Sequence, residues 1–86
     1  MNKIRVIFHQ FTMKQDVIVY NDNKVIEKFS VNLSDVINFV DGIRNKYDVN
    51  EINLVGNAIF VSNYRDKFQN KFNNNNIKIN SIFGNQ

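Results

Sequence analysis

Several residue types that build functional sites are missing from this sequence. It has no cysteine, no proline and no tryptophan, and it has one histidine among 86 residues. Without cysteine the chain forms no disulfide framework, no thiolate metal site and no cysteine nucleophile. A single histidine also excludes a metal site made from a histidine cluster. The three glycines are too few and too scattered for a glycine-rich phosphate turn.

Long hydrophobic runs are absent as well. No apolar stretch reaches the roughly 18 residues that a helix needs to cross a bilayer. The N-terminal stretch MNKIRVIF lacks the basic region, apolar core and small-residue cleavage site of a secretory signal. A chain of 86 residues has room for one small domain, spanning residues 1–86. We therefore expect a soluble, cytoplasmic, single-domain protein that does not bind membranes.

What the sequence has in excess is asparagine and, to a lesser degree, positive charge. Seventeen residues are asparagine, and isoleucine, lysine and phenylalanine are also plentiful, as expected for a gene from an AT-rich genome. This composition and the small size suggest an accessory protein of a phage or mobile element. The net charge of +3 favours acidic partners, but it is too small to indicate nucleic-acid binding by itself.

The first third of the chain predicts three β-strands. The stretches from Lys3 to Phe8, Asp16 to Tyr20 and Lys24 to Phe29 are rich in β-branched and aromatic residues. The short Asn21–Asn23 connection tolerates left-handed backbone, which predicts a hairpin between the second and third strands. A second turn centred on Thr12 and Met13 would connect the first two strands.

Counting outward from these turns predicts the cross-strand pairs. They are Tyr20 with Lys24, Ile18 with Ile26, Asp16 with Lys28, Arg5 with Tyr20, Ile7 with Ile18, and His9 with Asp16. Alternation then predicts one apolar face: Ile4, Val6, Phe8, Val17, Val19, Val25 and Phe29, with Glu27 as the exception. The opposite face is mixed and carries Arg5, Ile7, His9, Asp16, Ile18, Tyr20, Lys24, Ile26 and Lys28.

The rest of the chain predicts two helices that alternate with two strands. Apolar residues at helical spacing predict a first helix that starts near Asn32, which would cap it, and continues to Tyr47. Gly56-Asn57 is interpreted as a tight turn into a second helix, which Asn57 would cap and which ends at Phe72. We expect strands from Ile52 to Val55 and from Ile77 to Ile82, and a tail from Phe83 to Gln86.

The resulting order βββαβαβ resembles the ribonuclease H-like fold. The LVGN stretch at Leu54–Asn57 is similar to the strand-to-helix junction of small bacterial Holliday-junction-resolvase-like members. The resemblance implies an α/β fold with a five-stranded mixed sheet in the strand order 3-2-1-4-5. Right-handed crossovers would then place both helices on one face and leave the other face bare. Another two-layer arrangement, such as a variant of the ferredoxin-like split βαβ, is the alternative.

The acids that this resemblance would require are missing. Nucleases of the fold hold two metal ions with carboxylates, the first from an Asp in the middle of strand 1. Here residues 1–15 contain no acidic residue, and Gly56 and Asn57 stand where a second acid would be useful. His9 and Asp16 lack an accompanying nucleophile and are interpreted as a cross-strand polar pair. We therefore expect no enzyme activity, no catalytic or metal site and no cofactor.

The bare sheet face remains as the predicted site. Its isoleucine stripe with charges around it is typical of a protein interaction patch. The first hypothesis is a non-enzymatic interaction module that binds itself or a host protein through this face. The second is nucleic-acid binding by the same face, and the third, a small enzyme, is kept only as a remainder. The predicted contact residues are Arg5, Ile7, Ile18, Tyr20, Lys24, Ile26 and Lys28.

Overall fold

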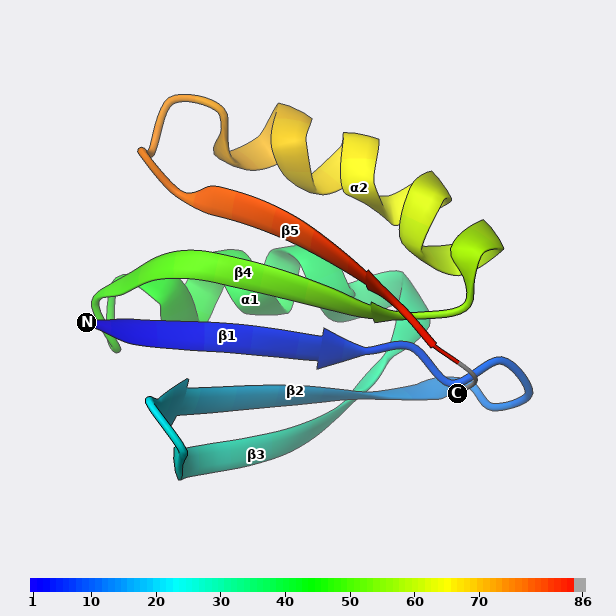
Figure 1. Cartoon of the computed structure of the whole chain (residues 1–86), viewed down its shortest axis with the longest axis horizontal. Helices are drawn as coiled ribbons and strands as arrows, with labels where there is room; N and C mark the ends of the chain where they lie inside the picture. Colours follow the sequence, from blue (N-terminus) through cyan, green and yellow to red (C-terminus); the bar gives the residue numbers. More distant parts are fainter. Residues whose placement is uncertain (85–86) are drawn as a thin grey trace.

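The protein folds as one five-stranded mixed sheet with two helices (Figure 1). The computed structural model describes residues 1–84. The strand order is β3-β2-β1-β4-β5, so the predicted fold class and strand order are confirmed. The elements are β1 (Asn2–Ile7), β2 (Lys14–Asn21), β3 (Lys24–Asn32), a 3₁₀ turn (Leu33–Asp35), α1 (Val36–Arg44), β4 (Val49–Gly56), α2 (Ala58–Phe72) and β5 (Lys78–Phe83).

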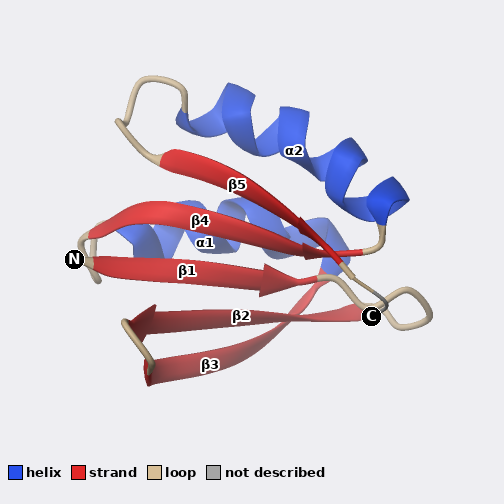
Figure 2. Ribbon diagram, in the orientation of Figure 1, coloured by secondary structure: helices blue, strands red, loops and turns tan. Residues whose placement is uncertain are grey.

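The order of the strands places both helices on the same side of the sheet. Strands β1, β4 and β5 are parallel, and β2 is antiparallel to β1 and β3. The chain crosses from β3 to β4 through α1 and from β4 to β5 through α2, in the same direction across the sheet, and right-handed crossovers then put both helices on one face. No helix is drawn in front of the strands in Figure 2.

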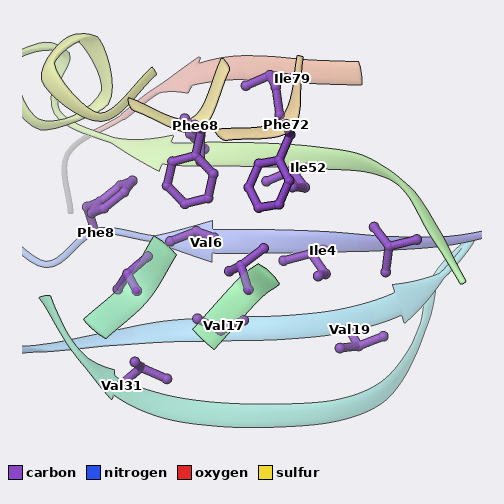
Figure 3. Close-up of a cluster of buried hydrophobic side chains, with 14 of the residues drawn as sticks. Ile4, Val6, Phe8, Val17, Val19, Val31, Ile52, Phe68, Phe72 and Ile79 are labelled. Carbon is purple, nitrogen blue, oxygen red and sulfur yellow. The ribbon is translucent and has the colours of Figure 1, made fainter. Parts of the chain in front are cut away.

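The core lies between this face and the helices (Figure 3). The strand residues predicted for the apolar face, from Ile4 to Phe8 and from Val17 to Val19, are fully buried at every second position. Val36 and Val40 of α1 and Phe68 of α2 belong to the same buried cluster. Phe8 also packs on α2, with ring centroids 6.2 Å from Phe60 and 5.1 Å from Tyr64.

The β2–β3 hairpin has a different register from the one that counting predicted. Asn21 pairs with Lys24 across a two-residue turn, where Asp22 takes a left-handed φ of 53°. Tyr20 then pairs with Val25, and the register shifts by one residue, so that Ile26 is left unpaired at a β-bulge. Farther along, Ile18 pairs with Lys28, and the predicted pairs Tyr20–Lys24, Ile18–Ile26 and Asp16–Lys28 are wrong.

The β1–β2 register is also two residues away from the prediction. Arg5 pairs with Ile18, Ile7 with Asp16 and Lys3 with Tyr20. The reason is a longer loop, residues 8–13, which buried Gln15 organises by accepting from the backbone N–H of His9 and donating to the carbonyl of Thr12. A shift of two residues keeps every side chain on its predicted face, so the faces of β1 and β2 are as predicted although the pairs are not.

Of the two predicted helix caps, one is wrong and one is confirmed. Asn32 makes no side-chain capping hydrogen bond, and α1 begins at Val36 and ends at Arg44, before Tyr47. Asn57 does cap α2, because its Oδ1 accepts from the backbone N–H of Phe60 at 3.0 Å. The predicted tail is partly wrong: Phe83 belongs to β5, while residues 85–86 lie outside the described residues.

Candidate interaction face

The sheet surface opposite the helices, here called the open face, is made of three rows of side chains that run across the strands. The rows follow from the pairing register, because paired residues share a face. The first row is Val25, Tyr20, Lys3, Glu51 and Lys78. The second row is Lys28, Ile18, Arg5, Asn53 and Asn80. The third row is Ser30, Asp16, Ile7, Val55 and Ile82.

The centre of the open face is closed by its own side chains. Tyr20 and Ile18, predicted as accessible anchors, are only 8% and 9% exposed. The Arg5 guanidinium lies over the Tyr20 ring, with its carbon 4.6 Å from the ring centroid. Because β2 is flanked by β1 and β3, its side chains on this face are covered by neighbours on both sides. The expectation that Tyr20 and Ile18 present free apolar surface is therefore wrong.

A ladder of hydrogen bonds joins three strands across this face. Asn53 is 6% exposed, and its Nδ2 donates to the Tyr20 hydroxyl at 2.6 Å and to Glu51 Oε2 at 3.1 Å. Asn53 Oδ1 in turn accepts from Asn80 Nδ2 at 2.9 Å. Within residues 1–84 no buried side-chain nitrogen or oxygen lacks a partner. A buried polar network satisfied in this way holds its members in one arrangement, so the open face is preformed.

Charge on the open face is unevenly distributed. Its four cations outnumber its two anions, giving a net +2. Glu51 is engaged by Lys3 at 3.6 Å as well as by Asn53, so little negative charge is left in the first row. Lys28 is 3.9 Å from Asp16 and its side chain is 61% exposed, which leaves it accessible to a partner. All four cations, Lys3, Arg5, Lys28 and Lys78, lie in the first two rows.

Apolar side chains gather instead in the third row. Ile7, Val55 and Ile82 are neighbours at the carboxyl ends of the three parallel strands. Each is at least partly exposed, and Ile82 is among the exposed large hydrophobic residues. The apolar strip of the open face therefore runs across β1, β4 and β5, and not along the predicted Ile18–Ile26 stripe.

The His9–Asp16 pair lies beside the third row. His9 Nε2 is 2.9 Å from Asp16 Oδ2, although Asp16 is paired with Ile7 in the ladder. The predicted contact is therefore confirmed through the loop and not through strand register. Lys28 approaches the same carboxylate, with its Nζ 3.9 Å from Asp16 Oδ2. No metal-holding group of three His, Asp or Glu side chains occurs in residues 1–84.

The structure brings together five of the seven predicted contact residues: Arg5, Ile7, Ile18, Tyr20 and Lys28. The other two, Lys24 and Ile26, are excluded by the bulge. Lys24 pairs with Asn21 on the opposite side of the sheet from Tyr20. Lys24 and Ile26 line a hollow with Asn21, whereas Val25 lines the one that contains Arg5 and Tyr20.

Sequence reasoning missed the contributions of β4 and β5. Glu51, Asn53 and Val55 alternate with buried Ile52 and Leu54. This alternation is visible in the sequence and places the three on the open face once the helices are placed on the other. The same period in β5 would have found Lys78, Asn80 and Ile82.

A membrane-crossing role has no helix to support it, because none in residues 1–84 combines the necessary length and apolarity. Comparison with known proteins assigns no family: no family model matches the chain and no curated protein matches it.

Proposed function

We propose that the protein is a non-enzymatic interaction module that binds another protein through the open face. The observation that carries this proposal is the division of the face into an apolar strip and a cationic part, the latter built around the polar ladder of Tyr20, Asn53 and Asn80. Such a combination suits a protein partner with acidic side chains beside an apolar ridge. The small size and AT-rich composition support a phage or mobile-element accessory protein that acts on a host factor.

The charge of the face favours a foreign partner over a second copy. Two open faces packed against each other would bring two net charges of +2 together, which costs free energy unless each cation meets an anion. Only Asp16 and Glu51 are available as anions, and both already contact cations of the same face. A partner with an excess of acidic residues avoids this cost.

Nucleic-acid binding is the alternative that the four cations support. Binding of single strands without sequence preference usually adds stacking of bases on exposed aromatic rings. Tyr20 is the aromatic residue of the three rows, and its ring is already covered by Arg5. The third row carries the apolar side chains of Ile7, Val55 and Ile82, whereas a surface that follows a nucleic-acid backbone would carry further cations there. These features favour a protein partner.

Site-specific photocrosslinking tests the proposal. A photoreactive amino acid at Lys28, on the open face, is expected to capture a discrete protein from an extract of the native source. The same group at Lys67, on α2 at the other side of the molecule, is the matched control and should capture none. Equal capture from both positions would contradict the proposed face. A labelled oligonucleotide retained at low salt, and released by Lys28→Glu with Lys78→Glu, would instead favour the nucleic-acid alternative.

A further inference from the structure

A second apolar surface lies at the end of the molecule where β1 and β5 finish and α2 begins. The β1–β2 loop, the first turn of α2 and the end of β5 all lie at this end (Figure 1). Backbone hydrogen bonds tie the start of the loop and the residue after β5 to the end of β4: Phe8 N–H donates to the Val55 carbonyl and Gly84 N–H donates to the Gly56 carbonyl, both at 2.8 Å. This end is distinct from the first two rows of the open face.

Four large apolar side chains are exposed at this end, which we call the apolar end. Phe11 and Met13 come from the β1–β2 loop, Ile59 from the first turn of α2, and Phe83 from the last position of β5. Phe11 is 91% exposed. Single exposed hydrophobic residues are ordinary, but four large ones from three elements at the same end of the molecule indicate an interaction site.

The loop that carries Phe11 and Met13 is held in place by hydrogen bonds. The side chain of Gln15 is fully buried and bonds the backbone of His9 and Thr12. The Thr12 hydroxyl also accepts from the N–H of Lys14 at 3.0 Å. A loop ordered before binding loses little conformational entropy on association, so exposed Phe11 is presented as a preorganised anchor.

Charge around the apolar end is balanced. The loop segment 9–16 carries one cation, Lys14, and one anion, Asp16, and the segments 57–62 and 80–84 carry none. Peripheral attachment to an anionic lipid surface relies on clustered lysine and arginine, which this end lacks. Because the loop, the first turn of α2 and the end of β5 carry no net charge of their own, two copies of a chain with net charge +3 can meet there without placing like charges of these segments in contact.

The exposed area is also of the right size for association of two copies. The four side chains are between 62% and 91% exposed, and a large side chain such as phenylalanine presents about 150–250 Å², so together they expose on the order of 600 Å². A standard protein interface buries about 800 Å² on each partner. Neighbouring residues of the same three segments supply the remainder. We propose that the apolar end is a homodimer interface in which the same patch of two copies packs about a two-fold axis.

The dimer leaves the cationic part of both open faces free, so the inference does not rest on the proposed function. Sedimentation analysis tests it, with an expected dissociation constant on the order of 10 μM. Wild type should be dimeric above that concentration, and Phe11→Ser with Ile59→Ser should be monomeric with an unchanged circular dichroism spectrum. Val25→Ser with Ile26→Ser removes the same number of exposed apolar side chains at the opposite end and should remain dimeric.

Three results would overturn the inference. They are a wild type that stays monomeric well above that concentration, a Phe11→Ser, Ile59→Ser variant that remains dimeric, and a Val25→Ser, Ile26→Ser control that dissociates equally. Flotation with vesicles of phosphatidylcholine and phosphatidylglycerol separates the lipid explanation. Recruitment of a monomeric wild type to these vesicles, lost in Phe11→Ser with Ile59→Ser, would identify the end as a lipid contact and also reject the dimer.

Discussion

At the scale of single residues, Gly56 occupies a position that has little room for a side chain. A Cβ added there would lie 3.1 Å from Phe8 Cβ and 3.2 Å from the Phe8 carbonyl oxygen, at a φ of 156° that side chains rarely adopt. We expect Gly56→Ala to lower the free energy of unfolding by about 1–3 kcal/mol, from backbone strain and crowding. Chemical denaturation measures it.

Gly42 provides the matched control in the same experiment. It lies inside α1, and a Cβ added there meets nothing within 4 Å. Gly42→Ala should therefore raise the free energy of unfolding by about 0.5–1 kcal/mol, because alanine costs less backbone entropy in a helix. Two Gly→Ala changes with the same sign would contradict the structural difference between the two sites.

Two asparagines that look alike as helix caps differ in the structure. Asn57 Oδ1 accepts from Phe60 N–H, whereas the Asn32 side chain bonds no helix backbone group. We expect Asn57→Ala to cost about 1 kcal/mol of stability and Asn32→Ala much less. Thermal denaturation of both variants measures the difference, and equal losses would refute it. The sequence predicted both caps, since residue type alone does not say whether the backbone presents its N–H groups.

At the scale of secondary-structure elements, the position of Glu27 on the apolar face is explained by its hydrogen-bond partner. It was the one acid on the predicted apolar face, and the structure places its carboxylate against the Tyr47 hydroxyl, which donates to it. The contact ties β3 to the segment after α1. The bulge in β3 and the β1–β2 loop were not predictable by counting, because counting assumes regular pairing outward from a turn. The loop is instead organised by the side chain of Gln15, and the β2–β3 register shifts at Tyr20. Alternation nevertheless predicted the buried faces of β1 and β2, since two-residue shifts preserve them.

The contact between Glu27 and Tyr47 predicts how the Tyr47 hydroxyl titrates. The hydrogen bond to Glu27, followed by burial and the Glu27 charge, raises the pKa of the Tyr47 hydroxyl above its usual 10. The neutral phenol is thus favoured in the folded state, and its stabilising effect is present below pH 10 and lost as the pH rises through the folded-state pKa. Ultraviolet difference titration of wild type against Tyr47→Phe should show late ionisation, and Glu27→Gln should shift it to lower pH. A Tyr47 titration unchanged by Glu27→Gln would contradict the contact.

At the scale of the whole molecule, the order of elements was enough to predict the sheet. Right-handed crossovers leave one arrangement for both helices, so the existence of an open face followed from topology. The composition of that face did not follow. Lys24 was assigned to it by an incorrect register, and Asn53 was overlooked although its buried amide joins β2, β4 and β5. The residues on a surface made by five strands depend on the register of every strand pair. The error in the β2–β3 hairpin placed Lys24 on the open face, where the structure has Val25.

The central claim, that the open face binds a protein, is tested most directly by affinity for the crosslinked partner. Calorimetry should show that Lys28→Glu with Lys78→Glu weakens binding about tenfold or more, equivalent to about 1.4 kcal/mol. Lys46→Glu with Lys67→Glu makes the same change in net charge away from the open face. It should alter affinity by less than about threefold, because salt screens the interaction between a partner and charges that lie far from its binding site. Equal weakening by both pairs, or none by the first, would contradict the claim.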